Sequence, residues 1–312
     1  MIPMRKHFMV LAMLLLFSGA AFGMLNFRPG GDMTQAAQQF LSSLPEAQQS
    51  QAVVAFDDPA RLDWHFIPKD MRKGVQIKHM SEASRKQAHA LLACGVSELG
   101  YKKAVTIMSL EGILRELEKK REGGPIRDPE RYYFTVFGAP AREGRWGWSV
   151  EGHHLSLNFV VEDGKATAIT PAFFGANPAE VQTSLEGAPK KGTRVLRDEE
   201  ELGFNLLHSL DKDQRSKAVI AEKALAEIRA AGEPNAPDAP PAGLPAKELK
   251  DEQVEVLWNL LNAYTDKMPT EIGAARIAEV RKAGIENVYF AWAGADKPGI
   301  GHYYRVQGPT FV

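Results

Sequence analysis

The sequence predicts an α+β fold in which an antiparallel β-meander and a C-terminal hairpin form a sheet that is packed by segregated helices. Apolar residues recur at helical spacing in the first third of the chain and again between residues 198 and 283. Segments rich in aromatic and β-branched residues, joined by short turns, occupy residues 131–170 and 287–307. Runs of helices separated from runs of strands favour the α+β class over a parallel, doubly wound sheet.

Six segments have the apolar spacing of amphipathic helices. Ser81 precedes the second segment as an N-cap, and a break is expected near Asp211 in the fourth. The third segment carries acidic and basic residues four positions apart, such as Glu111 and Arg115, which stabilise a helix. The predicted helices cover residues 34–51, 82–100, 103–121, 198–231, 248–264 and 270–283.

The predicted strands are bounded by turns that contain glycine or proline. Residues 138–144 and 162–164 separate three consecutive strands, which gives an antiparallel meander. A turn around Lys297-Pro-Gly299 separates the two strands of the hairpin. The strands cover residues 61–68, 131–137, 145–161, 165–170, 287–293 and 301–307.

The first 23 residues have the pattern of a secretory signal peptide. Arg5 and Lys6 precede an apolar run, and the small residues Ala21 and Gly23 occupy the cleavage positions. Residues 24–312 are therefore expected to form a single exported domain, periplasmic or extracellular, without a membrane span. Residues 232–246 contain five prolines and predict a linker or an exposed excursion from that domain.

Composition and missing motifs exclude several classes of function. With 38 basic and 39 acidic side chains, the chain lacks the basic excess of a nucleic-acid-binding protein. The sequence has no Walker A loop, no G-x-G-x-x-G after a strand, no G-x-S-x-G and no H-E-x-x-H. Common forms of nucleotide hydrolysis, Rossmann redox chemistry and serine hydrolysis therefore lose support.

Histidine and aromatic residues concentrate on the central meander. If residues 145–161 form one extended strand, Glu151 and His153 share its apolar face, while His154 lies on the other face. A buried, ionised Glu151 needs a partner, which is His153, an arginine or a metal ion. Gly152 indicates a bulge or a close backbone approach at this point.

These residues predict a metal-dependent site. His153, His154 and His302 are the candidate metal ligands, since a divalent ion is commonly held by imidazoles and carboxylates from adjacent strands. Glu151, His154 and Arg305 are the candidate catalytic residues, for a hydrolytic or an oxidative reaction. In the simpler interpretation, Glu151 and His153 form a buried ion pair and His154 faces water.

Four further residues are candidates for contact with a substrate. Trp148, Phe174, Asn177 and Tyr303 combine aromatic surface with polar groups near the predicted site. The alternatives are that Trp148 packs under a helix, that Phe174 closes the core of the meander, and that Tyr303 stacks on a neighbouring strand. A non-catalytic module that binds a small molecule or an envelope component is the second functional interpretation.

Several longer motifs carry a resemblance to a known family. The segments are Trp64-His-Phe-Ile-Pro68, Arg72-Lys-Gly74, Arg127-Asp-Pro-Glu130, Trp146-Gly-Trp148, Glu151-Gly-His-His-Leu-Ser-Leu-Asn158, Phe174-Gly-Ala-Asn-Pro178 and Gly301-His-Tyr-Tyr-Arg305. In these the chain resembles exported bacterial proteins that are grouped as a domain of unknown function, a family without an established activity. Similar proteins continue into a polar tail with a His-x-His and a Trp-Arg-Asp, so the resemblance implies that a chain ending at Val312 is truncated.

Overall fold

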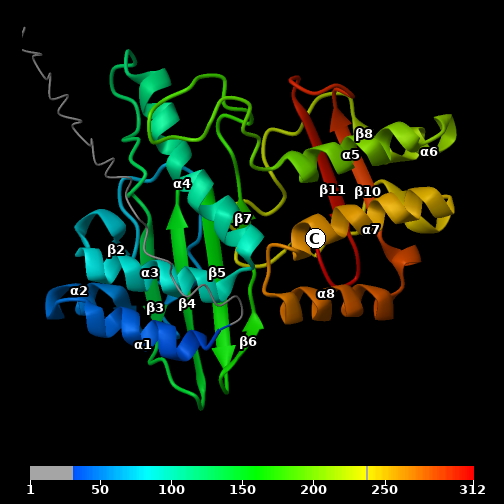
Figure 1. Cartoon of the computed structure of the whole chain (residues 1–312). Coiled ribbons are helices and arrows are strands. Elements are labelled where there is room, and N and C mark those ends of the chain that lie inside the picture. Colours follow the sequence, from blue (N-terminus) through cyan, green and yellow to red (C-terminus); the bar gives the residue numbers. More distant parts are fainter. Residues whose placement is uncertain (1–30, 237) are drawn as a thin grey trace, which may run out of the picture.

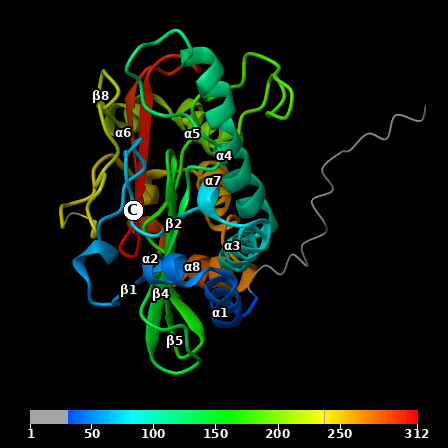
Figure 2. The same ribbon diagram turned by 90° about the vertical axis from the view of Figure 1, so that its left-hand side faces the viewer.

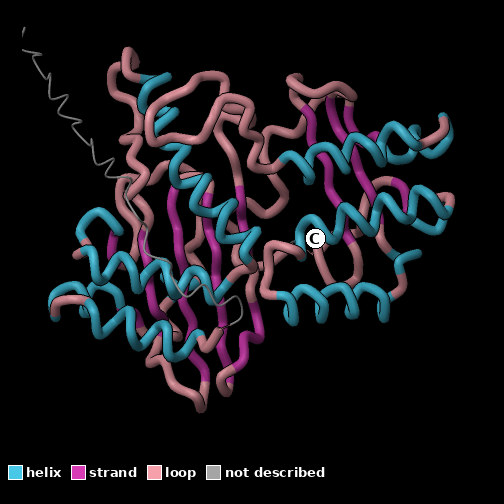
Figure 3. The backbone as a smooth tube through the Cα atoms, in the orientation of Figure 1, coloured by secondary structure: helices cyan, strands magenta, loops and turns pink. Residues whose placement is uncertain are grey.

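The chain folds into two lobes, each built on its own β-sheet. The computed structural model describes residues 31–236 and 238–312, so the predicted signal peptide lies outside the described residues. Figure 1 shows the two lobes side by side, and Figure 3 shows their strands as two separate groups. The α+β class is confirmed, although both sheets are mixed, because β1 runs parallel to β3 and β8 runs parallel to β10.

The predicted meander and hairpin lie in different sheets, which corrects the prediction of one sheet. The hairpin strands β10 (Tyr289–Gly294) and β11 (His302–Gln307) pair with each other. The other edge of β10 is occupied by β8 (Val219–Ala221) and β9 (Leu244–Pro245). Since both edges of β10 are taken within its own lobe, the hairpin cannot extend the meander through that strand.

The sheet of the first lobe has the order β1-β3-β4-β5-β6, with β2 beside β3 and β7 beside β5. Its long central strands are antiparallel, as predicted for the meander. The bounds are β1 Val53–Val54, β2 Val75–Gln76, β3 Tyr133–Phe137, β4 Arg145–Gly152, β5 Leu155–Glu162, β6 Lys165–Ala168 and β7 Ala172–Phe174.

The single long strand predicted for residues 145–161 is wrong. The chain reverses at His153 and His154, so that Gly152 pairs with Leu155 and β4 and β5 form a hairpin. His154 has a positive φ of 60°, a conformation that few residues other than glycine adopt. Gly152 permits the turn, because a Cβ atom there would lie 2.2 Å from the ring of Tyr132.

Helices cover one face of this sheet (Figures 1 and 2). The helix predicted for residues 34–51 is interrupted at Pro45, which gives α1 (Met33–Ser43) and α2 (Glu46–Ala52). The next two predicted helices are confirmed as α3 (Glu82–Gly95) and α4 (Glu98–Glu118), which are separated by the N-cap Ser97. The covered face is apolar and carries Phe134, Trp146, Trp148, Val150, Leu157 and Phe159.

The irregular segment 55–74 contributes to the cover of the opposite face. The strand predicted at residues 61–68 does not form. The guanidinium of Arg72 donates to the carbonyl oxygens of His65 and Ile67, which holds these residues away from a β ladder. The indole of Trp64 donates to the carbonyl oxygen of Glu233, so this segment also contacts the proline-rich excursion.

The second lobe packs four helices with the sheet β11-β10-β8. These helices are α5 (Arg197–Ser209), α6 (Lys212–Ala218), α7 (Asp251–Thr265) and α8 (Thr270–Ala283). The break near Asp211 is confirmed, with Asp211 as the N-cap of α6, but the helix does not continue to residue 231. Residues 219–221 instead join the sheet as β8. No helix in the described ranges is long and apolar enough to cross a membrane.

A buried ionic cluster connects the lobes. The carboxylate of Glu199 in α5 accepts hydrogen bonds from Lys103 in α4 at 2.7 Å and from Lys267, between α7 and α8, at 2.8 Å. The backbone of Lys267 also accepts a hydrogen bond from the amide of Ser97. The ammonium of Lys267 lies 5.3 Å from the ring centre of Phe174, at the end of β7. Residues of both lobes are therefore ordered around one carboxylate.

Candidate active site

The turn between β4 and β5 is fixed by hydrogen bonds to three other segments. The hydroxyl of Tyr132 donates to the carbonyl oxygen of His153 at 2.8 Å. The amide of His154 donates to the carbonyl oxygen of Phe66, and the amide of Gly175 donates to that of His154, both at 2.8 Å. Because each contact comes from a different part of the chain, the two imidazoles are held in fixed positions.

His153 forms a dyad with a carboxylate from the helical layer. Its Nδ1 lies 2.5 Å from Oε1 of Glu111 in α4, and both side chains are less than a tenth exposed. An ionised carboxylate only accepts hydrogen bonds, so with Glu111 ionised Nδ1 carries the proton and donates it to that carboxylate. This assigns the lone pair of the neutral ring to Nε2, which has no hydrogen-bond partner in the described part of the chain.

Arg127 lies beside this dyad as a second hydrogen-bond donor. One of its terminal nitrogens lies 3.1 Å from Nδ1 of His153 and 4.0 Å from Oε2 of Glu111. Its position is fixed by Glu118, which accepts two hydrogen bonds from the guanidinium. These bonds lower the pKa of the Glu118 carboxyl, so the pair stays charged at neutral pH.

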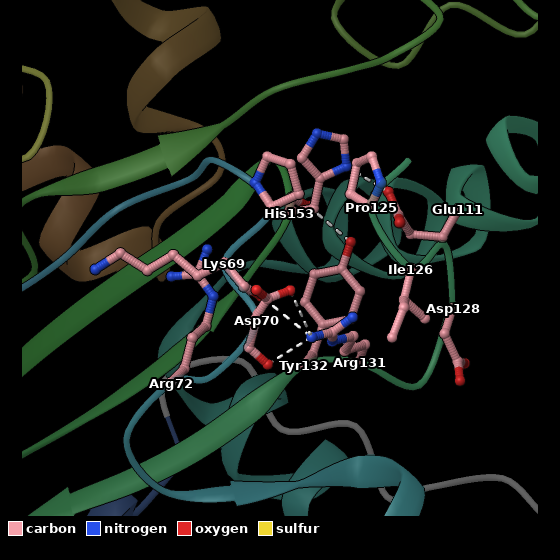
Figure 4. Close-up of a pocket in the computed structure, with 11 residues that line it drawn as sticks. Lys69, Asp70, Arg72, Glu111, Pro125, Ile126, Asp128, Arg131, Tyr132 and His153 are labelled. Atoms are coloured by element: carbon pink, nitrogen blue, oxygen red, sulfur yellow. Dashed lines mark hydrogen bonds and ion pairs between the residues drawn. The ribbon is translucent and has the colours of Figure 1, made fainter. Parts of the chain in front are cut away.

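A small cavity adjoins the dyad (Figure 4). It has a volume of about 20 Å³, which is room for about one water molecule. In Figure 4, Tyr132 lies among the lining residues with its hydroxyl pointing toward His153, and Arg131 contacts the backbone of Lys69 and Asp70. The lining residues are Pro68, Lys69, Asp70, Arg72, Glu111, Pro125, Ile126, Asp128, Arg131, Tyr132 and His153.

His154 packs beside the dyad as a neutral imidazole. Burial lowers its pKa to about 4, and the neighbouring His153 and Arg127 act in the same direction. Its ring meets that of His153 edge to face at 4.0 Å between centroids, and its Nδ1 is buried without a hydrogen-bond partner. A Cβ atom on Gly175 would lie 2.8 Å from that Nδ1, so the glycine lets the backbone approach the ring.

Glu151 is buried, as predicted, but its partners come from the irregular segment. Lys73 lies 2.7 Å and Arg72 lies 3.5 Å from its carboxylate oxygens. Burial raises the pKa of the Glu151 carboxyl, and the two cations oppose this effect. The carboxylate holds segment 55–74 against the sheet and does not line the cavity, so a catalytic role for Glu151 stays a prediction.

His302 does not join His153 and His154. It lies in β11 of the second lobe, where its ring stacks on Trp292 and its Nδ1 contacts the carbonyl oxygen of Ile300. Its Nε2 lies 3.5 Å from Glu200. The predicted meeting of these three imidazoles required one sheet, and the division into two sheets separates them.

The structure does not bring a set of metal ligands together around His153. Within residues 31–236 and 238–312, no group of three or more histidine, cysteine, aspartate or glutamate side chains is arranged to hold one. Metal binding by His153, His154 and His302 therefore stays a prediction.

The remaining predicted residues lie away from the cavity. Trp148 is completely buried and stacks on Phe159 at 4.0 Å, so it belongs to the core. Phe174 is half-buried at the edge of the same core, and Asn177 is exposed in the loop that follows β7. Tyr303 and Arg305 are half-buried in β11 of the second lobe. None of these five residues lines the cavity.

Two residues of the site, Glu111 and Arg127, were not predicted from the sequence. Glu111 was expected to pair with Arg115, but it is buried and faces His153. The available signal was its place on the apolar stripe of α4, four residues after Ile107 and three before Leu114. Arg127 belongs to a motif that carried the family resemblance, but nothing in its spacing connects it to His153.

The described geometry is that of a globular protein with a histidine–carboxylate dyad beside a small polar cavity. The chain matches the family model "Protein of unknown function (DUF3500)" over residues 28–312. It therefore belongs to this family, in agreement with the resemblance found in the sequence. No curated protein and no solved structure matches the chain.

Proposed function

We propose that the protein is an exported hydrolase in which His153, oriented by Glu111, acts as a general base. The observation that carries this proposal is the dyad itself, in which Nδ1 of His153 is bound to a buried carboxylate at the edge of a cavity. A carboxylate in this position fixes the ring tautomer and stabilises the imidazolium that forms when Nε2 takes a proton. Export rests on the signal-peptide pattern of residues 1–23.

The size of the cavity favours a hydrolytic reaction. A volume of about 20 Å³ admits one water and little else, so a substrate would bind at the mouth of the cavity. Nε2 of His153 would take one proton of that water as its oxygen attacks an acyl or phosphoryl centre. The imidazolium would then return the proton to the leaving group, so the net reaction consumes one water.

Arg131 is the group best suited to stabilise negative charge in this reaction. It lines the cavity, and its Nη2 donates to the carbonyl oxygens of Lys69 and Asp70. These bonds use one end of the guanidinium and leave its other donors for an oxyanion. The neighbouring Arg72 is committed to backbone carbonyl oxygens and to Glu151, so we assign it a structural role.

The test measures the rate at which the purified mature chain hydrolyses chromogenic carboxylic esters, phosphate esters and aryl amides. We expect hydrolysis of one class, with a loss of at least about 100-fold in His153→Gln and in Glu111→Gln. His79→Gln, at an exposed histidine away from the cavity, is the matched control and should retain the rate. Equal rates in all four proteins would contradict the assignment of His153.

A metal-dependent reaction gives a different outcome. Elemental analysis of the wild type, His153→Ala and His302→Ala measures whether an ion is bound and which residue holds it. A stoichiometric ion that is lost in His153→Ala would replace the metal-free mechanism. A stoichiometric ion that is retained in both variants would move the metal site elsewhere.

The second candidate function is a non-catalytic binding module. Phe66 and Phe173 stack at 3.9 Å next to the turn, and both are half-buried, which favours a flat ligand at this edge of the sheet. This candidate gains support if no ester or amide is turned over while a ligand raises the melting temperature of the wild type and not of Phe66→Ala.

A further inference from the structure

The last strand of the second lobe has an unpaired edge. The strand order β11-β10-β8 leaves β11 with β10 as its one partner strand within the described ranges. Figure 1 shows β11 at the margin of its sheet on the side of the first lobe. All six residues from His302 to Gln307 are partly exposed. An edge of this kind is a template for a further strand.

The register identifies the backbone groups that face outward. The amide of Ala295 donates to the carbonyl oxygen of Gly301, which closes the hairpin, and Ala293 is paired with Tyr303. Hydrogen-bonded and non-hydrogen-bonded pairs alternate along an antiparallel ladder. The outward N–H and C=O groups are therefore those of His302, Tyr304 and Val306. None of them makes a backbone hydrogen bond to another described segment.

An unused arginine lies on the same strand. Arg305 has no carboxylate within 4.0 Å in the described ranges, and its Nε is buried without a hydrogen-bond partner. Gln307, two positions along on the same face, donates from its Nε2 to the carbonyl oxygen of Ala239 but has a buried Oε1 that lacks a partner. A half-buried guanidinium without a counter-charge lowers the stability of the fold, so an anionic group bound at this face would be stabilised by pairing with it.

We propose that the edge of β11 binds an extended peptide segment that carries an acidic side chain. The outward amides and carbonyl oxygens would pair with the peptide backbone, as in strand addition to other sheets. The carboxylate would pair with the guanidinium of Arg305, and a peptide donor would satisfy Oε1 of Gln307. A simple anion would satisfy Arg305 alone and leave the outward backbone groups unused.

The charge on this strand also argues against a second copy of the chain as the occupant. Two β11 strands paired antiparallel about a twofold axis would place both Arg305 side chains on one face, without a carboxylate between them. An acidic peptide from another protein satisfies the same edge without that repulsion.

The test uses fluorescence anisotropy with the full chain and a labelled nonapeptide of alternating valine and threonine with one central glutamate. We expect saturable binding. Arg305→Gln should weaken it at least about tenfold, and so should lysine in place of the peptide's glutamate. Arg305→Gln should bind the lysine peptide only slightly more weakly than it binds the glutamate peptide, because the ion pair is already lost. A peptide N-methylated at alternate residues should bind at least about tenfold more weakly, because it cannot form the ladder.

Three results would overturn the proposal. The first is no binding of the glutamate peptide, and the second is equal affinity for the glutamate and lysine peptides. The third is a dimer of the peptide-free chain in light scattering that Val306→Pro dissociates, which would assign the edge to a second copy. Val306→Pro removes an outward N–H and no bond to β10, and Val306→Ala is its matched control.

Discussion

Glu111 and His153 meet across the interface between the helical layer and the first sheet, 42 positions apart in the sequence. The carboxylate stands on the apolar stripe of α4, where a charge is costly unless it is paired. The imidazole stands at a hairpin turn that three other segments hold in place. Helix and turn are therefore aligned by the same contact that fixes the tautomer of His153.

The Glu151 carboxylate is predicted to be essential for the stability of the first lobe. Glu151→Gln leaves the cations of Arg72 and Lys73 buried beside a neutral amide, and we expect a loss of about 3–5 kcal/mol. Glu162→Gln, which breaks a pair with exposed Arg145 on the same hairpin, should change stability by less than about 1 kcal/mol. Urea unfolding measures both, and a loss below about 1 kcal/mol in Glu151→Gln would refute the structural role.

Because His154 is buried as a neutral imidazole, we predict that the free energy of unfolding falls in mild acid. Its folded pKa of about 4 lies below the ordinary value of 6.5, so the unfolded chain binds the proton first as pH falls. Stability is therefore unaffected above pH 6.5 and is lost as pH falls toward 4, by about 3 kcal/mol. His65 and His89, whose pKa values burial also lowers, add to the fall in the same direction.

The variant that isolates this effect is His154→Asn. Asparagine tolerates the positive φ of this position and does not titrate, so the difference in stability between wild type and variant should change between pH 7 and pH 4. His79→Asn, at an exposed histidine, is the control. Urea midpoints at several pH values give the comparison, and parallel curves for wild type and His154→Asn would count against a buried neutral imidazole.

Replacing each of two helical glycines by alanine is predicted to change the stability of the protein in opposite directions. A Cβ atom at Gly95 in α3 would lie 2.6 Å from the indole of Trp148, and we expect Gly95→Ala to destabilise by about 1–3 kcal/mol. At Gly112 in α4 the nearest atom is 4.0 Å away, so Gly112→Ala should stabilise by about 0.5–1 kcal/mol through helix propensity. A melting temperature that rises in Gly95→Ala would contradict the packing of Trp148 against α3, and one that falls in Gly112→Ala would contradict the open space at that position.

The sequence predicted the fold class and most helices because these depend on local periodicity. The helices at 248–264 and 270–283 differ from α7 and α8 by at most three residues at an end. The hairpin turn at His153 was missed because a histidine pair lacks the glycine or asparagine that usually marks such a turn. The strand predicted at residues 61–68 failed because tertiary hydrogen bonds from Arg72 override its local preference.

The site was predictable only in part. His153 was identified from its neighbours in sequence. Glu151 is buried as predicted, but strand alternation placed it on the face of Leu157 and Phe159, whereas the register pairs it with Ser156 on the opposite face. The partners of both residues lie far along the chain, Glu111 for the first and Lys73 for the second. Spacing carries no information about such contacts. His302 was grouped with His153 because one sheet was assumed, and that assumption depended on which strands are adjacent.

The hydrophobic clusters of the two lobes have no residue in common. Because each lobe has its own apolar core, cooperative unfolding of the whole chain depends on the contacts between the lobes. Lys103, Glu199 and Lys267 join the lobes through a buried ionic cluster, and Met268 and Ile272 of the second lobe also pack against the apolar core of the first. Because these three side chains are less than a tenth exposed, salt screens their attraction only weakly, and acid that protonates Glu199 is the condition that weakens this link between the lobes.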